Sequence, residues 1–538
     1  MGYTEQFLNA PLITQIIIAT TNVLYLIFWL VALKKDFLIS AFIVSVFVVA
    51  ANYMVIMFFS GIDVVTFLTI YILPAALTFI ILFSLFKLLG STFKKSLSIS
   101  QVKIPHTKGV TIVNTIKGVS IQGAPGSGKT ISGAGWILDS FGKKSVPGLV
   151  YDYKNLELTE IVMWFYRNAD LPVHVFHPSD PSRSCNINCF DPAILNKRED
   201  FMIMAKTLTD NLIDDDSKSP FFKNAAEGAI AGVLIRLKED FPEYCSFPYL
   251  TAIFLEKSID ELIEFLEGNP NSKRQAGTFL DSAGARDQMA GVKGNLSNAF
   301  RAFDLPNVFY TTMKNDFELE INNKKTPGLV VLVNSPNYDE VYQPLLAVTA
   351  QAIILKMSKR NREFAYLMFD EAPTLKLSRM PRIPSTMRSF NIATIYMLQD
   401  KIQAANQLGV NKMKEVLANL STLFFGKTND PETAKFFEAY FEQVKVKQRS
   451  FSTKEGLFME SQDRRVSVSE RDEKKHKSYE MFKRGTGQFF IIDDKGNSHD
   501  VAIKKPKIEI EPFKKTRAIS VLEINSNYDR ILSIAKKL

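Results

Sequence analysis

An eight-residue run in the first quarter of the chain has the pattern of a phosphate-binding loop. Its glycines allow successive backbone N–H groups to turn toward one anion, and the closing Lys-Thr pair adds a cation and a hydroxyl. We expect Lys129 to contact the β- and γ-phosphates of a nucleotide, and the hydroxyl of Thr130 to bind Mg²⁺. The pattern therefore predicts a site for ATP and Mg²⁺. The predicted nucleotide-binding residues are Gly123, Ala124, Pro125, Gly126, Ser127, Gly128, Lys129 and Thr130.

A strand that ends in two carboxylates would complete such a site. The apolar run Tyr366–Phe369 is followed directly by Asp370 and Glu371. Asp370 would hold Mg²⁺ at the strand tip, and Glu371 would act as the catalytic base that polarises the attacking water. Asp152 is the alternative, because it also ends an apolar run, but Lys154 rather than a second acid follows it. We therefore favour Asp370 and Glu371.

Two more polar residues flank a further apolar run, Ala393–Leu398. Gln399 follows the run and would sense the γ-phosphate or position the attacking water. Arg388 precedes it and would act as an arginine finger on a neighbouring subunit, a role whose alternative is a solvated charge on a helix surface. His174 and His177 lack a third ligand in the sequence, so we interpret them as structural.

These candidates lie at the ends of short apolar runs that alternate with helical segments. Alternation of this kind predicts an α/β fold with a parallel, doubly wound sheet. A phosphate loop that follows a strand and opens a helix has the expected context. The predicted strands are Gly118–Gln122, Gly148–Asp152, Val173–His177, Gly328–Asn334, Tyr366–Asp370, Ala393–Leu398 and Thr422–Gly426.

The alternation stops between about Arg198 and Asn322, where helical patterns predominate. We interpret this break as an all-α insertion within the α/β domain. Ser450–Arg484 is polar and charged without apolar periodicity, which predicts an exposed loop. The predicted domains are a membrane anchor at 1–100, a nucleotide-binding domain at 101–200 and 323–538, and the all-α insertion at 201–322.

The first hundred residues are much more apolar than the rest of the chain. Apolar stretches at 12–33, 37–60 and 64–86 each approach or exceed the ~20 residues that cross a bilayer. Lysines follow the first and third stretches, whereas the amino-terminal tail and the turn after the second carry none. The positive-inside rule then places everything after Lys87 in the cytoplasm. We expect a multi-pass protein of the inner (cytoplasmic) membrane with three spans and a cytoplasmic ATPase domain.

Composition narrows the class of protein. The 538 residues are 46% hydrophobic and 22% charged, which is typical of a folded chain with several domains. Three cysteines are too few for a disulfide framework and predict buried thiols. The 65 basic residues exceed the 56 acidic ones, giving a net charge of +9 that suits an anionic partner such as nucleic acid. A lysine-rich solubilising surface would give the same excess.

Five segments share their order with a known family. They are GAPGSGKT (123–130), LVYDYKNLEL (149–158), FDEAPTL (369–375), TMRSFNIATIYMLQD (386–400) and NLSTLFFGKTNDPETA (419–434). With the apolar amino-terminal region, they resemble the coupling proteins of type IV secretion systems, the TraG/TraD family of conjugation ATPases. The resemblance implies amino-terminal transmembrane helices and a RecA-like P-loop NTPase domain interrupted by an all-α domain. It also implies a homohexamer that receives single-stranded DNA with its relaxase, or protein substrates, and passes them to the secretion channel.

Two other functions use similar parts. A duplex-DNA translocase of the FtsK kind would share the motor, but such pumps usually end in a winged-helix domain, and only about 35 residues follow Lys504. A membrane docking receptor would bind nucleotide only to switch conformation. The presence of Lys129, Asp370 and Glu371 together favours hydrolysis over a switch.

Overall fold

The computed structural model describes residues 97–538 except five short segments, which are 214–219, 282–285, 400–403, 406–408 and 454–463. Leu97–Leu538 forms one compact unit. The three predicted membrane spans lie outside the described residues. Within the described residues, no helix combines the length and apolar character needed to cross a membrane. The predicted multi-pass inner-membrane localisation is therefore corrected: it rested on apolar runs and on the lysines that follow them, and no described helix supports it.

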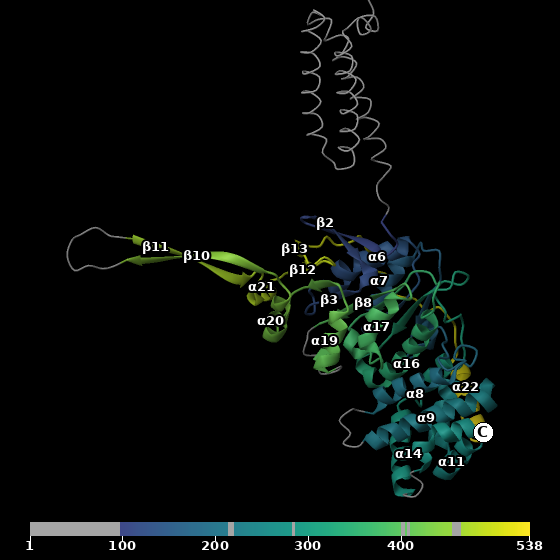
Figure 1. Cartoon of the computed structure of the whole chain (residues 1–538). Coiled ribbons are helices and arrows are strands. Elements are labelled where there is room, and N and C mark those ends of the chain that lie inside the picture. The colour runs from purple at the N-terminus through teal and green to yellow at the C-terminus, as the bar shows by residue number, and fades with distance from the viewer. Residues whose placement is uncertain (1–96, 214–219, 282–285, 400–403, 406–408, 454–463) are drawn as a thin grey trace, which may run out of the picture. The chain divides into compact units, whose positions relative to one another are not determined.

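A nine-stranded sheet lies at the centre of the described unit (Figure 1). Its strands are β3 (Val119–Gln122), β4 (Gly148–Asp152), β5 (Val173–Phe176), β6 (Leu329–Val333), β7 (Ala365–Phe369), β8 (Ile392–Leu398), β9 (Thr422–Phe425), β12 (Gln488–Ile492) and β13 (Ser498–Ala502). Their spatial order is β13-β12-β9-β3-β8-β7-β4-β6-β5. The seven predicted strands are all present and run parallel to one another. The prediction of a wholly parallel sheet is wrong at one edge, where β12 and β13 add antiparallel pairs.

Each central strand contributes to two apolar cores. In β7, Tyr366 and Met368 pack on the face covered by α6 (Gly135–Lys143) and α7 (Glu157–Tyr166). Leu367 and Phe369 belong to the core on the opposite face, which also includes α16 (Asp339–Met357). Because successive side chains of a strand point to opposite faces, a sheet covered on both faces needs continuous apolar runs. This requirement explains why the central strands were recognisable from sequence.

Helices occupy the chain between β5 and β6. They are α8 (Arg198–Leu212), α9 (Pro220–Asp240), α10 (Phe247–Glu256), α11 (Ile259–Glu267), α12 (Pro270–Gln275), α13 (Gly277–Asp281), α14 (Arg286–Arg301) and α15 (Pro306–Thr312). The described part of this segment contains no strand. Its apolar core is continuous with the core on the α16 face of the sheet. The last helix of the chain, α22 (Val521–Ala535), packs on α10 and α15 rather than on the sheet.

Two hairpins form two-stranded sheets separate from the central sheet, and one of them projects from the body (Figure 1). One joins β1 (Gln101–His106) to β2 (Gly109–Asn114), and the other joins β10 (Gln443–Thr453) to β11 (Arg464–Lys474). The prediction of an exposed loop at Ser450–Arg484 is therefore wrong for most of that segment. The remaining helices are α17 (Ile383–Arg388), α19 (Val410–Ala418), α20 (Pro431–Ala439) and α21 (Ser478–Phe482).

Candidate nucleotide-binding site

The phosphate loop joins β3 to a π-helical turn, η3 (Lys129–Ala134), which continues into α6. Gly126 and Gly128 have φ angles of +75° and +90°, a region that side chains with a Cβ avoid. A Cβ on Gly128 would also lie 2.9 Å from the backbone nitrogen of Gly487. Glycine is therefore required at residue 128 for both backbone conformation and space.

The loop is fixed to both strands that neighbour β3. Gly123 N donates a hydrogen bond to Leu398 O at 3.2 Å, and Ala124 N donates to Lys427 O at 2.7 Å. Lys129 is buried, and its Nζ donates to Gly123 O at 2.5 Å. The Oγ of Ser127 is buried with no hydrogen-bond partner among the described residues. The loop thus holds a buried cation and an unsatisfied hydroxyl next to backbone N–H groups.

A cavity of about 200 Å³ opens on this loop. Besides residues of the loop and of η3, four side chains line it: Lys154, Glu157, Thr486 and Lys505. Three lysines, counting Lys129, therefore border the cavity with a single carboxylate. This excess of positive charge suits a polyphosphate. None of these four residues belongs to the phosphate-loop pattern, so that pattern alone does not place them at the cavity.

The two predicted acids follow β7, two strands away from β3. Asp370 N donates to Tyr151 O at 3.0 Å, which continues the β4–β7 pairing by one residue. Glu371 then takes φ +49° and ψ +49°, a left-handed conformation that is uncommon outside glycine. Its Oε1 accepts a hydrogen bond from Gln399 N at 3.3 Å, whereas its Oε2 is buried without a partner among the described residues. The structure thus brings Glu371 and Gln399 together, as neighbouring strand ends require.

Burial dominates the electrostatics of these acids. Desolvation, with the nearby carboxylates of Asp152 and Glu371, raises the pKa of Asp370 to about 7, while Lys154 and Lys129 act in the opposite direction. Desolvation also raises the pKa of Glu371. Clustered carboxylates of this kind gain from a cation. Within the described residues no three His, Cys, Asp or Glu side chains form a metal site by themselves.

The carboxylate of Asp152 accepts hydrogen bonds from residues at and just before the start of α7. Its Oδ2 accepts from Thr159 N at 2.8 Å and from Thr159 Oγ1 at 2.6 Å, and its Oδ1 accepts from Lys154 N at 3.0 Å. Burial raises its pKa, and these hydrogen bonds offset part of that rise. Such a bonding pattern favours a structural role for Asp152 over the catalytic one considered as the alternative.

Arg388 lies at the other end of the sheet from the phosphate loop. It is the exposed last residue of α17, just before β8, whereas Gln399 follows the far end of that strand. The seven residues of β8 separate the two by about 20 Å at 3.3 Å per residue. Arg388 therefore cannot reach the phosphates of its own chain, and any role in hydrolysis requires a second copy.

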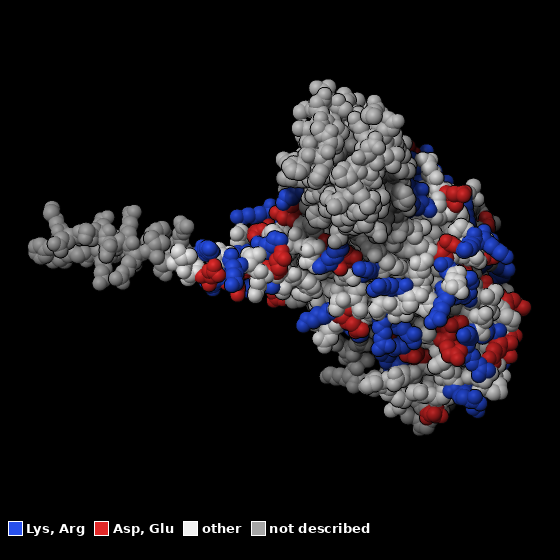
Figure 2. Space-filling view, turned by 45° about the horizontal axis from the view of Figure 1, so that its top comes forward, with Lys and Arg blue, Asp and Glu red and all other residues white. Residues whose placement is uncertain are grey.

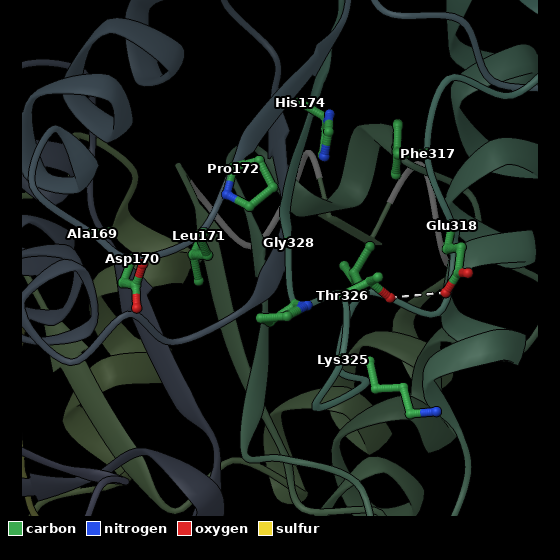
Figure 3. A pocket seen from close by; sticks show the side chains of 12 residues that line it. Ala169, Asp170, Leu171, Pro172, His174, Phe317, Glu318, Lys325, Thr326 and Gly328 are labelled. Atoms are coloured by element: carbon green, nitrogen blue, oxygen red, sulfur yellow. Dashed lines mark hydrogen bonds between the residues drawn. The ribbon is translucent and has the colours of Figure 1, made fainter.

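The histidines and cysteines lie outside the site. The His174 ring stacks on Phe317, with centroids 3.9 Å apart and planes 7° apart, beside a separate cavity of about 560 Å³ (Figure 3). His177 Nδ1 lies 2.9 Å from Ser179 Oγ, and burial lowers its pKa to about 4. All three cysteines are free and buried. These environments fit the structural roles that the sequence predicted.

Comparisons with known proteins place this geometry in a family. A family model described as Type IV secretory system Conjugative DNA transfer matches residues 94–472. The bacterial conjugative coupling protein TrwBdeltaN70, in its unbound monoclinic form, has a TM-score of 0.57 at 15% sequence identity, covering 80% of this chain and 92% of that chain. No curated protein sequence matches the chain.

Two further solved structures carry nucleotides. The plasmid coupling protein TrwB in complex with the non-hydrolysable ATP analogue ADPNP, and the same protein in complex with ADP and Mg²⁺, each have a TM-score of 0.56 at 15% identity, covering 75% of this chain and 88% of those chains. These likenesses show an α/β P-loop NTPase fold with a mixed central sheet. Because the family model spans most of the sequence, this chain belongs to the Type IV secretory system conjugative DNA transfer family, and it is a P-loop ATPase of the coupling-protein class.

Proposed function

We propose that this chain hydrolyses Mg²⁺-bound ATP at the phosphate loop and uses the reaction to move DNA toward a type IV secretion channel. The observation that carries the proposal is the convergence of three adjacent strands, β3, β8 and β7. The phosphate loop, Gln399 and the Asp370-Glu371 pair follow the carboxyl ends of these strands, so all three lie at the same end of the sheet. The nucleotides bound to TrwB support the same choice of ligand.

The residues present fit ATP and Mg²⁺. The unpartnered Ser127 hydroxyl and the lysine-lined cavity suit phosphate oxygens. Burial raises the pKa of Asp370 and two lysines offset only part of that rise, so a bound cation would stabilise its ionised form. Thr130 and Asp370 would hold Mg²⁺, directly or through water, and Lys129 would contact the β- and γ-phosphates. The metal would neutralise charge on the phosphate oxygens.

Glu371 is placed to act as the general base. The backbone of Gln399 orients one carboxylate oxygen, and the other is left to accept a proton from water. Burial raises the pKa of Glu371, which makes its carboxylate a better proton acceptor at neutral pH. The side chain of Gln399, at the tip of the intervening strand, would position that water or sense the γ-phosphate.

Hydrolysis in this scheme depends on assembly. Arg388 is exposed on the end of the sheet remote from its own phosphate loop, so its contribution would come in trans. A homohexameric ring would bring it to the next subunit's site, and such a ring would enclose a path for the cargo. The cargo we propose is single-stranded DNA with its relaxase, or a protein substrate, delivered to channel components.

The family description and the net charge of +9 support DNA as the cargo. On the face that Figure 2 shows, basic and acidic side chains are interspersed, so the charge there is not gathered into one patch. The segment after β13 ends in the single helix α22, which packs on the helical segment.

Phosphate release by the full-length chain, measured with and without DNA, tests this function. We expect single-stranded DNA to raise turnover more than duplex DNA, and its affinity to fall steeply with salt because phosphate contacts release counterions. Lys129→Ala should abolish turnover without lowering the melting temperature. Equal turnover in the variant would remove the phosphate-loop assignment. Nucleotide binding without any turnover would favour the nucleotide-switched receptor.

A further inference from the structure

The segment that follows β13, residues 503–520, lies along the molecule without helix or strand and is here called the strap. Side chains from α6 and α7 hold its backbone. Trp136 Nε1 donates to Lys504 O at 2.6 Å, and Trp164 Nε1 donates to Lys507 O at 3.2 Å. Between them Pro506 is buried, and its Cγ would lie 3.1 Å from a Cβ on Gly135. The strap is therefore a fitted part of the α6–α7 face.

One end of the strap lies at the phosphate loop. Ile503 N donates to Gly487 O at 2.8 Å, and Gly487 N donates to Ser127 O at 2.8 Å. The neighbouring Thr486 donates its hydroxyl to Gly126 O at 2.8 Å. Two residues along the strap, Lys505 lines the same cavity as the phosphate loop. A change in the conformation of the phosphate loop would therefore displace the residues at the start of the strap.

The other end is joined to the helical segment through α22. Arg517 pairs with Asp316 as the strap leaves the sheet. Within α22, Tyr528 OH donates to Asp304 Oδ1 at 2.6 Å, and Glu523 Oε1 accepts from Tyr310 OH at 2.6 Å. Ile531 and Ala535 of the same helix are buried. The strap thus connects the phosphate loop to the helices between β5 and β6 through the covalent chain, which polar contacts fix near both of its ends.

The charges of the residues that line the cavity indicate a role for Lys505. Lys505 is exposed and forms no ion pair among the described residues, whereas Lys154 lies 3.9 Å from Glu157. Only one carboxylate opposes the three lysines of the cavity, so a nucleotide phosphate is the complementary partner for Lys505. We propose that Lys505 binds the phosphates of the bound nucleotide, and that this contact tightens the strap and so couples nucleotide binding to the packing of α22. The inference rests on nucleotide binding at the phosphate loop, as proposed above.

Binding of a non-hydrolysable ATP analogue to the full-length chain tests the contact. We expect Lys505→Ala to weaken binding about tenfold, the loss of one charge-assisted hydrogen bond at a solvated site. Lys505→Arg should retain most of the affinity. Lys507→Ala is the matched control, because Lys507 is also an exposed lysine of the strap but does not line the cavity. Equal affinity in Lys505→Ala and the control would overturn the assignment.

Hydrogen exchange across α22, with and without the analogue, tests the coupling. The analogue should slow exchange in the wild type and in Lys507→Ala but not in Lys505→Ala at saturating concentration. If the analogue leaves the exchange rate of α22 unchanged in the wild type, the coupling is overturned even if Lys505 binds phosphate. Failure of the wild type to bind the analogue, or full binding by Lys129→Ala, would instead overturn the proposed function itself.

Discussion

Glu371 and Asp152 are both buried carboxylates close to Asp370. Their amide variants should nevertheless differ, because one should lose turnover and the other should lose stability. In Glu371→Gln, the amide oxygen can still accept from Gln399 N, and the nitrogen replaces an oxygen that has no partner among the described residues. Stability should therefore change little. Loss of the general base should lower turnover by about 10²- to 10⁴-fold while nucleotide binding persists.

Asp152→Asn should instead weaken the fold. Three hydrogen bonds, two of them from Thr159 and one from Lys154 N, converge on the two carboxylate oxygens. An asparagine amide has one acceptor oxygen, so its nitrogen must face at least one N–H or O–H donor. Losing one hydrogen bond to a charged group, with a buried donor left unsatisfied, costs about 2 kcal/mol. We expect a melting temperature several degrees lower and turnover reduced far less than in Glu371→Gln.

Phosphate release and thermal unfolding, measured on the same preparations, distinguish the two. We expect Glu371→Gln to be inactive and as stable as the wild type, and Asp152→Asn to be active but less stable. The reverse pattern, an inactive Asp152→Asn with an unchanged melting temperature beside an active Glu371→Gln, would place the catalytic acid on β4 and refute the assignment.

Three other predictions concern residues other than the proposed general base, Glu371. Arg388→Ala should lose DNA-stimulated turnover yet regain part of it in rings mixed with Glu371→Gln, and no recovery in confirmed mixed rings would exclude action in trans. His177 has a folded-state pKa of about 4, below its ordinary 6.5, so the unfolded chain binds more protons between those values. About 3 kcal/mol of stability should therefore be lost as pH falls from 6.5 toward 4, and unfolding of His177→Phe should show a smaller acid loss than the wild type. Gly142→Ala should lower the melting temperature markedly, because its Cβ would overlap the backbone oxygen of Phe165; an unchanged value would mean that α6 and α7 separate at no cost.

The central strands could be predicted from sequence because they are buried on both faces. Gly148–Asp152 was predicted with the bounds that the structure has, and Tyr366–Asp370 differs from β7 by one residue at each end. The positions of the candidate residues at strand ends followed from that register. Phosphate-loop spacing is a local pattern, so its place between a strand and a helix required no knowledge of long-range packing.

The hairpin β10–β11 was missed for the opposite reason. Val446 and Val468 are exposed, and this two-stranded sheet carries charges on both faces, with Lys445 and Glu470 on one face and Arg471 on the other. Apolar and polar residues do alternate at 444–447 and 466–469, but these runs are short and lie in a strongly charged segment, so the interpretation as a loop overlooked them. The antiparallel addition of β12 depends on pairing with β9, which the run Gln488–Ile492 alone does not indicate.

The contribution of Thr486 and Lys505 to the nucleotide cavity could not be predicted at all. More than 350 residues separate Thr486 from Gly126, the carbonyl to which it donates. No pattern in either segment indicates the other, since the contact arises from the turn that leads into β12. Long-range contacts of this kind are set by sheet topology rather than by local sequence.

The place of β3 in the sheet has a consequence for synthesis of the chain on the ribosome. Val119 pairs with Ile395 on one side and with Thr422 on the other, so both neighbours of β3 are translated long after it. At roughly 5–20 residues per second, the wait is on the order of ten seconds to a minute. Meanwhile the helices from Arg198 to Thr312 emerge and can pack locally, whereas β3 keeps two open edges. The nascent phosphate-loop strand is therefore the segment most in need of protection by chaperones, and chains that terminate before β8 should aggregate rather than accumulate as soluble fragments.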